Sequence, residues 1–194
     1  MGSVLVIGGG AAGLAAAIAA AECGDTVTVA EKMDRVGKKI LATGNGRCNL
    51  MNTGAPRYPG NAAFAADVLS QCGAEAQKAF WEHLGLRLRQ EEAGRVYPVS
   101  SQASSVLDAL RLQLTALHVR VVTGVSITAL HRENDGWTAL SADGQRFRAN
   151  RVIISGGGCA QPKLGSDGSA LRLLTNLGCP ATPFAPALTQ IITD

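Results

Sequence analysis

The sequence predicts an α/β fold of three layers built on a parallel β-sheet, and three stretches carry this prediction. Residues 3–7 form an apolar run that leads through a glycine-rich turn into an alanine-rich stretch at 14–21, a pattern typical of a strand followed by a closely packed helix. Residues 26–30 form a second run of strand length. Residues 151–154 form a third apolar run that ends at glycines, which is typical of a parallel strand buried on both faces.

The turn after the first strand has the spacing Gly8-x-Gly10-x-x-Gly13. In a dinucleotide-binding turn the first glycine permits the tight bend, the second lets a pyrophosphate approach the backbone, and the third lets the helix pack on the strand. The N-terminus of the helix then presents amides and a positive dipole end to the phosphates. We therefore expect contacts to a pyrophosphate from Gly8, Gly10, Ala11, Ala12 and Gly13.

Glu31 ends the second strand, eighteen positions after Gly13. An acid about 20 residues beyond the turn accepts hydrogen bonds from an adenosine ribose, and its charge disfavours a 2′-phosphate. FAD or NAD is therefore expected rather than bound NADP. The alternative is a glycine-rich turn in an ordinary α/β protein, followed by an acid at this distance by chance.

Composition indicates a folded globular chain, because 46% of the 194 residues are hydrophobic and 17% are charged. The net charge of +3 comes from scattered basic residues, so no nucleic-acid partner is expected. The three histidines lie far apart, and the five cysteines contain no Cys-x-x-Cys pair. A metal site and a disulfide framework are therefore not expected, and a reducing cytoplasm is the expected location.

Residues 3–21 carry no charge and are mostly apolar, so their length is close to that of a membrane span. No basic segment precedes them, which argues against a signal peptide. A strand, a glycine turn and a helix explain the same run, and we expect no membrane segment.

The loop from Glu31 to Met51 combines three glycines with several basic side chains. One interpretation is a solvated basic loop. The other is a second clamp on the dinucleotide, with cations near a phosphate or an electron-rich ring. The Thr-Gly-Asn-Gly-Arg-Cys-Asn run at 43–49 favours the clamp, whose cations are Lys32, Lys38, Lys39 and Arg47.

Residues 37–52, Gly-Lys-Lys-Ile-Leu-Ala-Thr-Gly-Asn-Gly-Arg-Cys-Asn-Leu-Met-Asn, resemble the signature of a bacterial FAD-dependent flavoprotein family. That family includes aminoacetone oxidase-like enzymes and a bile-acid enoyl reductase. Residues 94–101 and 152–168 resemble it too, so the resemblance covers essentially the whole chain. It implies bound FAD, with Arg47 and Asn49 as the best polar contacts in a flavin-side segment that includes Thr43, Gly44, Arg47, Cys48 and Asn49.

The resemblance also implies that Val125 lies beside the adenine, with its backbone amide and carbonyl as contacts. It places the turn of Ser155, Gly156 and Gly157 against FAD, although family members have Ala-Thr-Gly-Gly there. Cys48 is expected to be a packing residue, since no resolving cysteine adjoins it. For Tyr97 two interpretations are open, namely an approach to the flavin and a place at the edge of a short strand.

Residues 61–118 are expected to form a mainly helical insertion. One helix is capped by Asn61 and runs through Val68, and a second spans 74–84 with Phe80 and Trp81 as core anchors. A third is capped by Ser100 or Ser101 and runs through Leu117. The third should bury Val106, Leu107, Leu110 and Leu114. A short extended pair, 86–89 and 95–97, lies between the second and third helices.

Residues 119–148 switch to a period of two and predict a β-meander with strands at 119–122, 126–130, 137–140 and 145–148. A loop at 162–168, a helix at 169–177 stopped by Gly178, a linker at 180–186 and a strand at 188–192 follow.

The predicted architecture is a three-layer Rossmann-like FAD-binding domain over residues 1–186, with the start of a truncated second domain at 187–194. The expected function is FAD binding in a flavin-dependent oxidoreductase, and three alternatives compete. These are a reductase that takes electrons from NAD(P)H, an oxidase of small amines such as aminoacetone, and a non-catalytic FAD-binding module. The expected partners are a small-molecule substrate and a missing C-terminal portion of the same fold; no residue can be named as a general acid or base.

Overall fold

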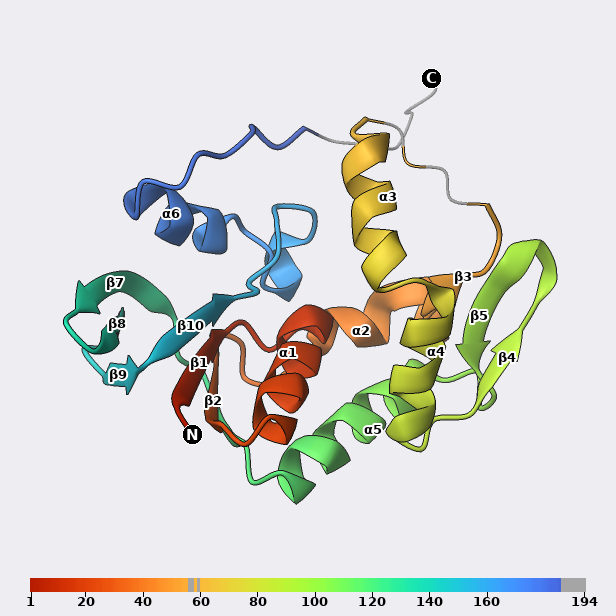
Figure 1. Cartoon of the computed structure of the whole chain (residues 1–194), viewed down its shortest axis with the longest axis horizontal. Helices are drawn as coiled ribbons and strands as arrows, with labels where there is room; N and C mark the ends of the chain where they lie inside the picture. The colour runs from red at the N-terminus through yellow and green to blue at the C-terminus, as the bar shows by residue number, and fades with distance from the viewer. Residues whose placement is uncertain (56–57, 59, 186–194) are drawn as a thin grey trace. The chain divides into compact units, whose positions relative to one another are not determined.

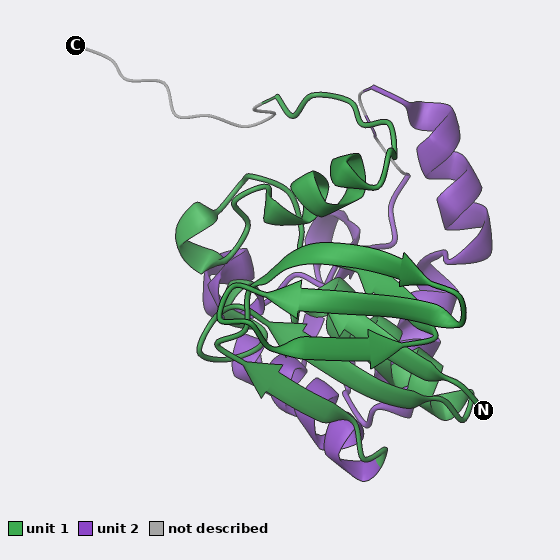
Figure 2. Cartoon of the chain, turned by 90° about the vertical axis from the view of Figure 1, so that its left-hand side faces the viewer, with its two compact units in different colours: residues 1–39, 117–194 green, residues 40–116 purple. Residues whose placement is uncertain are grey.

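The computed structural model describes residues 1–55, 58 and 60–185. The chain divides into two compact units, coloured separately in Figure 2. Unit 1 contains residues 1–39 and the chain from 117 onward, and unit 2 contains residues 40–116. The expected strand at 188–192 and the expected domain start at 187–194 lie outside the described residues.

A four-stranded parallel sheet forms the middle of unit 1, with the strand order β10-β1-β2-β6. Figure 1 labels three of its strands, β10, β1 and β2. Its strands are β1 (Ser3–Ile7), β2 (Thr26–Glu31), β6 (Arg120–Thr123) and β10 (Arg151–Ile154). Val6 of β1 lies opposite Val29 on one side and Ile153 on the other. The three stretches that predicted a parallel sheet are therefore neighbours in it.

Helix α1 (Ala11–Glu22) packs on β1 and β2. Its buried residues include Leu14, Ala17 and Ile18, which are fully excluded from solvent. The alternation along β1 places Val4 and Val6 on one face and Leu5 and Ile7 on the other, and all four are buried. A strand buried on both faces requires a layer on each side of the sheet.

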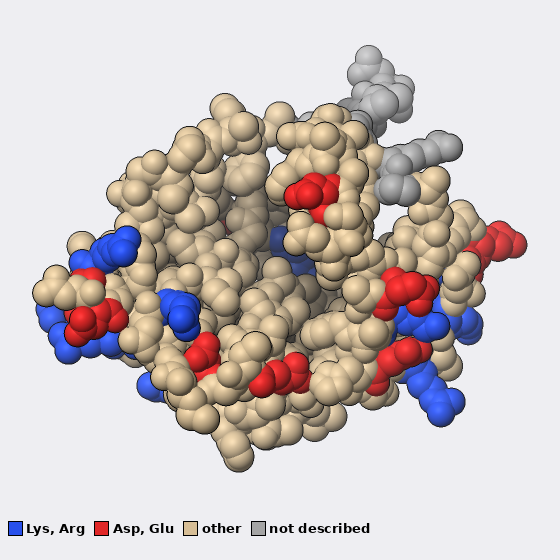
Figure 3. Space-filling model, in the orientation of Figure 1, with Lys and Arg blue, Asp and Glu red and all other residues tan. Residues whose placement is uncertain are grey.

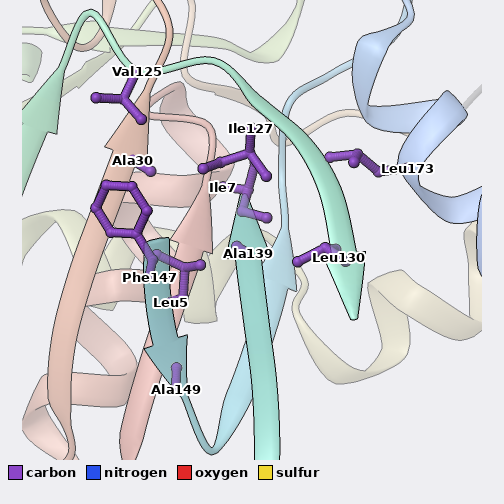
Figure 4. Packing of buried hydrophobic residues seen from close by; sticks show 10 residues of the cluster. All are labelled: Leu5, Ile7, Ala30, Val125, Ile127, Leu130, Ala139, Phe147, Ala149 and Leu173. Atoms are coloured by element: carbon purple, nitrogen blue, oxygen red, sulfur yellow. The ribbon is translucent and has the colours of Figure 1, made fainter. Parts of the chain in front are cut away.

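The layer on the face of the parallel sheet opposite α1 is an antiparallel meander. It consists of β7 (Ile127–Glu133), β8 (Gly136–Ser141) and β9 (Arg146–Ala149). Figure 4 shows Leu5, Ile7 and Ala30 of the parallel sheet packed with Ala139 and Phe147 of the meander. Unit 1 thus has three layers, consisting of a helix, a parallel sheet and a meander, as the sequence predicts.

Two strand predictions are wrong in detail. The strand expected at 119–122 as part of the meander is β6, which pairs in parallel with β2 (Val29 opposite Val121). A long segment separates Glu31 from Arg120, and such connections join parallel strands. In addition, β10 is a sheet edge whose three apolar residues are only partly buried.

Unit 2 combines helices with a small antiparallel sheet of order β3-β5-β4. Helix α2 (Lys38–Ala42) leads into it and is followed by the 3₁₀ turn η1 (Thr43–Gly46). These two elements stand where the sequence predicts a loop. The remaining elements are β3 (Met51–Asn52), α3 (Ala62–Gln71), α4 (Ala74–His83), β4 (Leu88–Gln90), η2 (Glu92–Gly94), β5 (Arg95–Pro98) and α5 (Ala103–Ala116).

The predicted helices of unit 2 are present. The Asn61 side chain accepts a hydrogen bond from the Phe64 amide (3.0 Å) and caps α3. The four residues predicted for the core face of α5 are all buried. However, α5 begins at Ala103 rather than directly after Ser100 or Ser101, and the φ of 53° at Ser101 lies outside the extended region that a capping residue adopts.

Phe80 and Trp81 were predicted as core anchors and are only half-buried, packed edge to face with ring centroids 5.1 Å apart. The helix α4 that carries them buries no residue fully. Its sequence identifies aromatic rings but not the partner surface that would enclose them.

After β10 the chain forms the 3₁₀ turn η3 (Pro162–Leu164) and helix α6 (Ser169–Asn176), close to the predicted bounds. Gly178 has a φ of 82°, as expected for a helix stop. Residues 180–185 contain no regular element. Within the described part of the chain, every helix is too short or too polar to cross a bilayer.

Candidate functional site: the turn after β1 and the adjoining pocket

The three glycines of the turn after β1 have different surroundings. Gly8 has a φ of 106°, and a Cβ atom there would lie 2.8 Å from the Gly156 backbone. A Cβ atom on Gly13 would lie 1.9 Å from the Gly8 carbonyl oxygen. A Cβ atom on Gly10 would meet nothing within 4 Å. Gly8 and Gly13 are thus required by the fold, whereas Gly10 borders open space, which is what its predicted contact with a pyrophosphate requires.

The N-terminus of α1 faces the same turn. The first intrahelical hydrogen bond runs from the Leu14 amide to the Gly10 carbonyl (2.9 Å). The amides of Ala11, Ala12 and Gly13 therefore lie ahead of the helical ladder, where they lack helical acceptors and suit an anion. The sequence predicts these three residues as phosphate contacts, and their geometry is compatible with that role.

Glu31 is buried, with 8% of its surface exposed, and it fastens the turn to the end of β2. Its carboxylate accepts hydrogen bonds from the amides of Gly9 (2.6 Å) and Met33 (2.8 Å). Each carboxylate oxygen has a further lone pair, so Glu31 retains capacity to accept from a ribose. Gly9 was not predicted as a special position, yet a Cβ atom there would lie 2.5 Å from the Val36 side chain.

A pocket in unit 1 adjoins Gly8 and Glu31 at the carboxyl ends of β1 and β2. Residues of β7 and α6 form its apolar walls. The amide of Val125, predicted as an adenine contact, instead donates to the Glu31 carbonyl (2.9 Å). The residues that line the pocket are Ile7, Gly8, Ala30, Glu31, Lys32, Val125, Ser126, Ile127, Gly156, Gly165, Ser169, Ala170 and Leu173.

Lys32 lines this pocket, but its ammonium group already has protein partners. Its Nζ lies 2.6 Å from Asp167 Oδ1 and 3.1 Å from Ser169 Oγ. The lysine, followed by hydrogen bonds from Ser169, holds the pKa of Asp167 far below its usual value. Sequence reasoning missed Asp167 and Ser169, although an Asp-Gly-Ser run before a predicted helix is a recognisable start signal.

The other two lysines of the loop differ in place. Lys38 pairs with Asp34 four residues earlier. Lys39 donates to the hydroxyl of Ser166, a residue that is 3% exposed. A Cβ atom on Gly157 would lie 3.6 Å from Lys39 Nζ, so Lys39 reaches the turn after β10.

The turn after β10 packs directly on the turn after β1. The Ser155 amide donates to the Ile7 carbonyl (2.8 Å), and its hydroxyl lies 3.0 Å from the Gly8 carbonyl oxygen. A Cβ atom on Gly156 would lie 2.7 Å from the Cβ of Ala170. The structure thus brings Ser155, Gly156 and the fingerprint glycines together, and the sequence predicts all of them as cofactor contacts.

The predicted flavin-side residues lie in unit 2 and form a connected group. The guanidinium of Arg47 pairs with Glu91 and lies 4.0 Å from the centre of the Tyr97 ring. This ion pair raises the pKa of Arg47 and lowers the pKa of Glu91. Glu91 also binds Arg89 (2.8 Å), and neither Glu91 nor Arg89 was singled out from the sequence.

Most of the remaining predicted residues of this segment stabilise or permit its turns. Thr43 donates to the Ile40 carbonyl (2.7 Å), and Gly44 has a φ of 55°. With its amide oriented to match its neighbours, Asn49 donates to the carbonyls of Val96 (3.2 Å) and Met51 (3.0 Å). Cys48 is buried, and burial raises the pKa of its thiol, which fits a packing residue.

The chain is similar to curated bacterial proteins over most of its length. The chain is 45% identical over 196 residues to 3-dehydro-bile acid delta(4,6)-reductase of Clostridium scindens, covering 98% of this chain and 47% of that protein. It is 25% identical over 191 residues to ribosomal RNA dihydrouridine synthase of Haemophilus influenzae, covering 92% of this chain and 46% of that protein. The chain spans about half the length of the curated relatives it matches.

Solved structures share the fold at low sequence identity. The open conformation of a flavocytochrome c3 fumarate reductase is 17% identical with a TM-score of 0.65, over 91% of this chain and 40% of that chain. The 3-ketosteroid-delta4-(5alpha)-dehydrogenase of Rhodococcus jostii RHA1 is 18% identical with a TM-score of 0.58, over 81% of this chain and 46% of that chain.

The family resemblance drawn from residues 37–52 is confirmed. Residues 2–185 match the family described as HI0933-like protein Rossmann domain. The match spans nearly the whole chain, including the fingerprint turn, the pocket and all of unit 2. This chain belongs to the HI0933-like protein Rossmann domain family.

Proposed function

We propose that this chain is the FAD-binding part of an oxidoreductase. The observation that carries the proposal is the contrast at the turn after β1, where Gly8 and Gly13 are enclosed by backbone and Gly10 faces space under a helix N-terminus. This arrangement suits a pyrophosphate. The acid at the end of β2 and the apolar pocket beside it then suit the adenosine.

Residues of unit 1 would hold the adenosine diphosphate end. The amides of Ala11 and Ala12 would bind the pyrophosphate, Glu31 the ribose, and Ile127 and Leu173 would flank the adenine. Bound flavin supplies hydride and oxygen chemistry, while the protein supplies orientation and electrostatics. Thr43, Gly44, Arg47, Cys48 and Asn49 stay predicted flavin-side contacts.

We favour reduction as the direction of the reaction. The support is the identity of 45% to a protein named as a reductase. Its named substrate, a 3-dehydro-bile acid, is the first small molecule to test, with NAD(P)H as the transient electron donor. Because the chain spans about half the length of that relative, we assign turnover to a polypeptide of the relatives' length.

The first test is to purify the chain and record its visible spectrum, because bound flavin absorbs at about 450 nm. One FAD released per chain on denaturation is the expected result. A colourless protein that binds no added FAD would contradict the proposal. Anaerobic addition of NADH to the loaded chain, and to a version extended with the reductase's C-terminal portion, then tests whether electron transfer needs the longer polypeptide.

A second candidate is reduction of a base in ribosomal RNA, favoured by the matches to two proteins named ribosomal RNA dihydrouridine synthase at 25% and 23% identity. On the face shown in Figure 3, basic and acidic side chains are interspersed. This mixture gives little support to a surface that binds the phosphate backbone of RNA. Binding of the chain to ribosomal RNA fragments at two salt concentrations separates this candidate from the first.

A further inference from the structure

We propose that Asp167 sets the nucleotide specificity of the pocket by neutralising Lys32, so that an adenosine ribose without a 2′-phosphate is selected. The inference rests on the proposed function, because it assumes that the pocket beside Glu31 receives the adenosine end of a dinucleotide. It adds a residue and a selection rule that the fingerprint itself does not contain.

The position of Lys32 makes it the natural partner of a 2′-phosphate. It follows Glu31 directly and lines the same pocket, and it is the single lysine or arginine among the described residues that line it. In dinucleotide-binding domains the residue at the end of the second strand faces the ribose, and a cation nearby accommodates a 2′-phosphate. An unpaired Lys32 would therefore offset the unfavourable effect of Glu31 on a 2′-phosphate.

In the structure the ammonium group of Lys32 is already paired with protein acceptors. Asp167 Oδ1 lies 2.6 Å from Lys32 Nζ, and Ser169 Oγ lies 3.1 Å from it. The Lys32 side chain lines the pocket and is 21% exposed, whereas its partner Asp167 does not line the pocket and is 43% exposed. Two of the three hydrogen-bond donors of the ammonium group are thus committed to protein acceptors.

The charges of the three residues give the direction of selection. Glu31 and Asp167 are carboxylates and Lys32 is one cation, so these three side chains together carry a net negative charge beside the pocket. A 2′-phosphate would approach this charge while the one lysine among the described lining residues is already paired, and like charges in a partly buried site repel strongly. A ribose hydroxyl is neutral and donates to Glu31 without that cost.

Asp167 can be changed with little damage to the backbone. Its Oδ1 also accepts from the Ser169 amide (3.0 Å) at the start of α6. Asparagine keeps an acceptor oxygen at that place, and serine offers a hydroxyl to the same amide. Both substitutions remove the negative charge, so Asp167→Asn and Asp167→Ser give two independent versions of one test.

The experiment measures binding of ADP and of 2′,5′-ADP to the chain by titration calorimetry. The unaltered chain should bind ADP and discriminate against 2′,5′-ADP. Asp167→Asn and Asp167→Ser should raise the affinity for 2′,5′-ADP by about tenfold, because Lys32 then becomes free to make one charge-assisted contact to the 2′-phosphate. The affinity for ADP should stay nearly unchanged. Adding Lys32→Met to Asp167→Asn should abolish the gain.

Asp34→Asn is the matched control. It removes the same charge and releases Lys38, a lysine of the same loop that does not line the pocket. The ratio of the two affinities should stay at the unaltered value in this control, and thermal unfolding checks that every variant is folded.

An unchanged ratio in both Asp167 variants overturns the inference, as does a gain that persists without Lys32. A gain of the same size in Asp34→Asn overturns it too, because a general charge effect would then suffice. If the unaltered chain binds neither ADP nor FAD, the proposed function fails and the inference fails with it. Binding of ADP with no response to Asp167 overturns the inference alone.

Discussion

The carboxylate of Glu31 and the amide of Gly9 lie 2.6 Å apart, so the acid that should hold a ribose also holds the glycine turn. Its second oxygen binds the Met33 amide. Glu31 is therefore part of the scaffold as well as the predicted ribose contact, and its removal should affect stability and affinity together.

We expect Glu31→Ala to lower the free energy of unfolding and to weaken FAD binding, each by about 1 to 3 kcal/mol, because buried amides lose their acceptor. Glu31→Gln should lie between, since its amide oxygen can satisfy one of the two donors. Denaturant unfolding of the apoprotein and FAD titration measure the two effects. A lower affinity at unchanged stability would show that Glu31 serves the ribose alone.

Gly10→Val and Gly13→Ala should fail in different ways. Gly10 has a φ of −81° and open space at its Cβ position, so the valine variant should fold but exclude the pyrophosphate. Gly13→Ala should unfold or rearrange, because its Cβ would overlap the Gly8 carbonyl. Circular dichroism and flavin content read the two outcomes. A Gly10→Val variant that keeps full FAD occupancy would show that the cofactor lies elsewhere.

Arg47→Ala should lower the reduction potential of bound flavin, if Arg47 lies near the pyrimidine end of the ring, because a cation there favours the anionic reduced form. Glu91→Gln should move the potential in the opposite direction, since it removes the anion paired with Arg47. Equilibrium titration against a reference dye gives both potentials. Weaker affinity at an unaltered potential would place Arg47 at the phosphates instead.

Cys48 should be the slowest cysteine to react. Burial raises the pKa of its thiol, and a thiolate is the reactive form. The other four cysteines are exposed. A thiol reagent at neutral pH should label Cys23, Cys72, Cys159 and Cys179 in the folded chain, and all five after denaturation. Mass spectrometry locates the labels, and rapid labelling of Cys48 in the folded chain would contradict its role in packing.

The Lys32–Asp167 pair should withstand mild acid. The pKa of Asp167 in the folded chain lies far below its usual value of 3.8, so the pair stabilises the folded state above that value and is lost as the pH falls through the folded-state pKa. The difference in thermal midpoint between the unaltered chain and Asp167→Asn should therefore stay constant from neutral pH to about pH 5 and shrink below about pH 4. A difference that disappears near neutral pH would contradict the assignment.

The parts of the fold that the sequence predicts are those with strong local patterns. The strand at 3–7, the glycine turn, and the core face with Val106 and Leu110 follow from spacing alone. The sheet to which β6 belongs could not be predicted. A strand of four residues shows the same alternation of side chains whether it belongs to a meander or to a parallel sheet. The partner of Lys32 could not be predicted either, since Asp167 lies 135 positions away along the chain and meets it only in the folded structure.

The edge position of β10 has a consequence for handling the protein. Among the described strands it pairs only with β1, and Val152, Ile153 and Ile154 are half-buried along it. An apolar strand with one row of uncommitted amides and carbonyls is a template for strand addition from another molecule. This chain by itself should therefore self-associate as its concentration rises, and a charged substitution such as Ile153→Lys should keep it monodisperse.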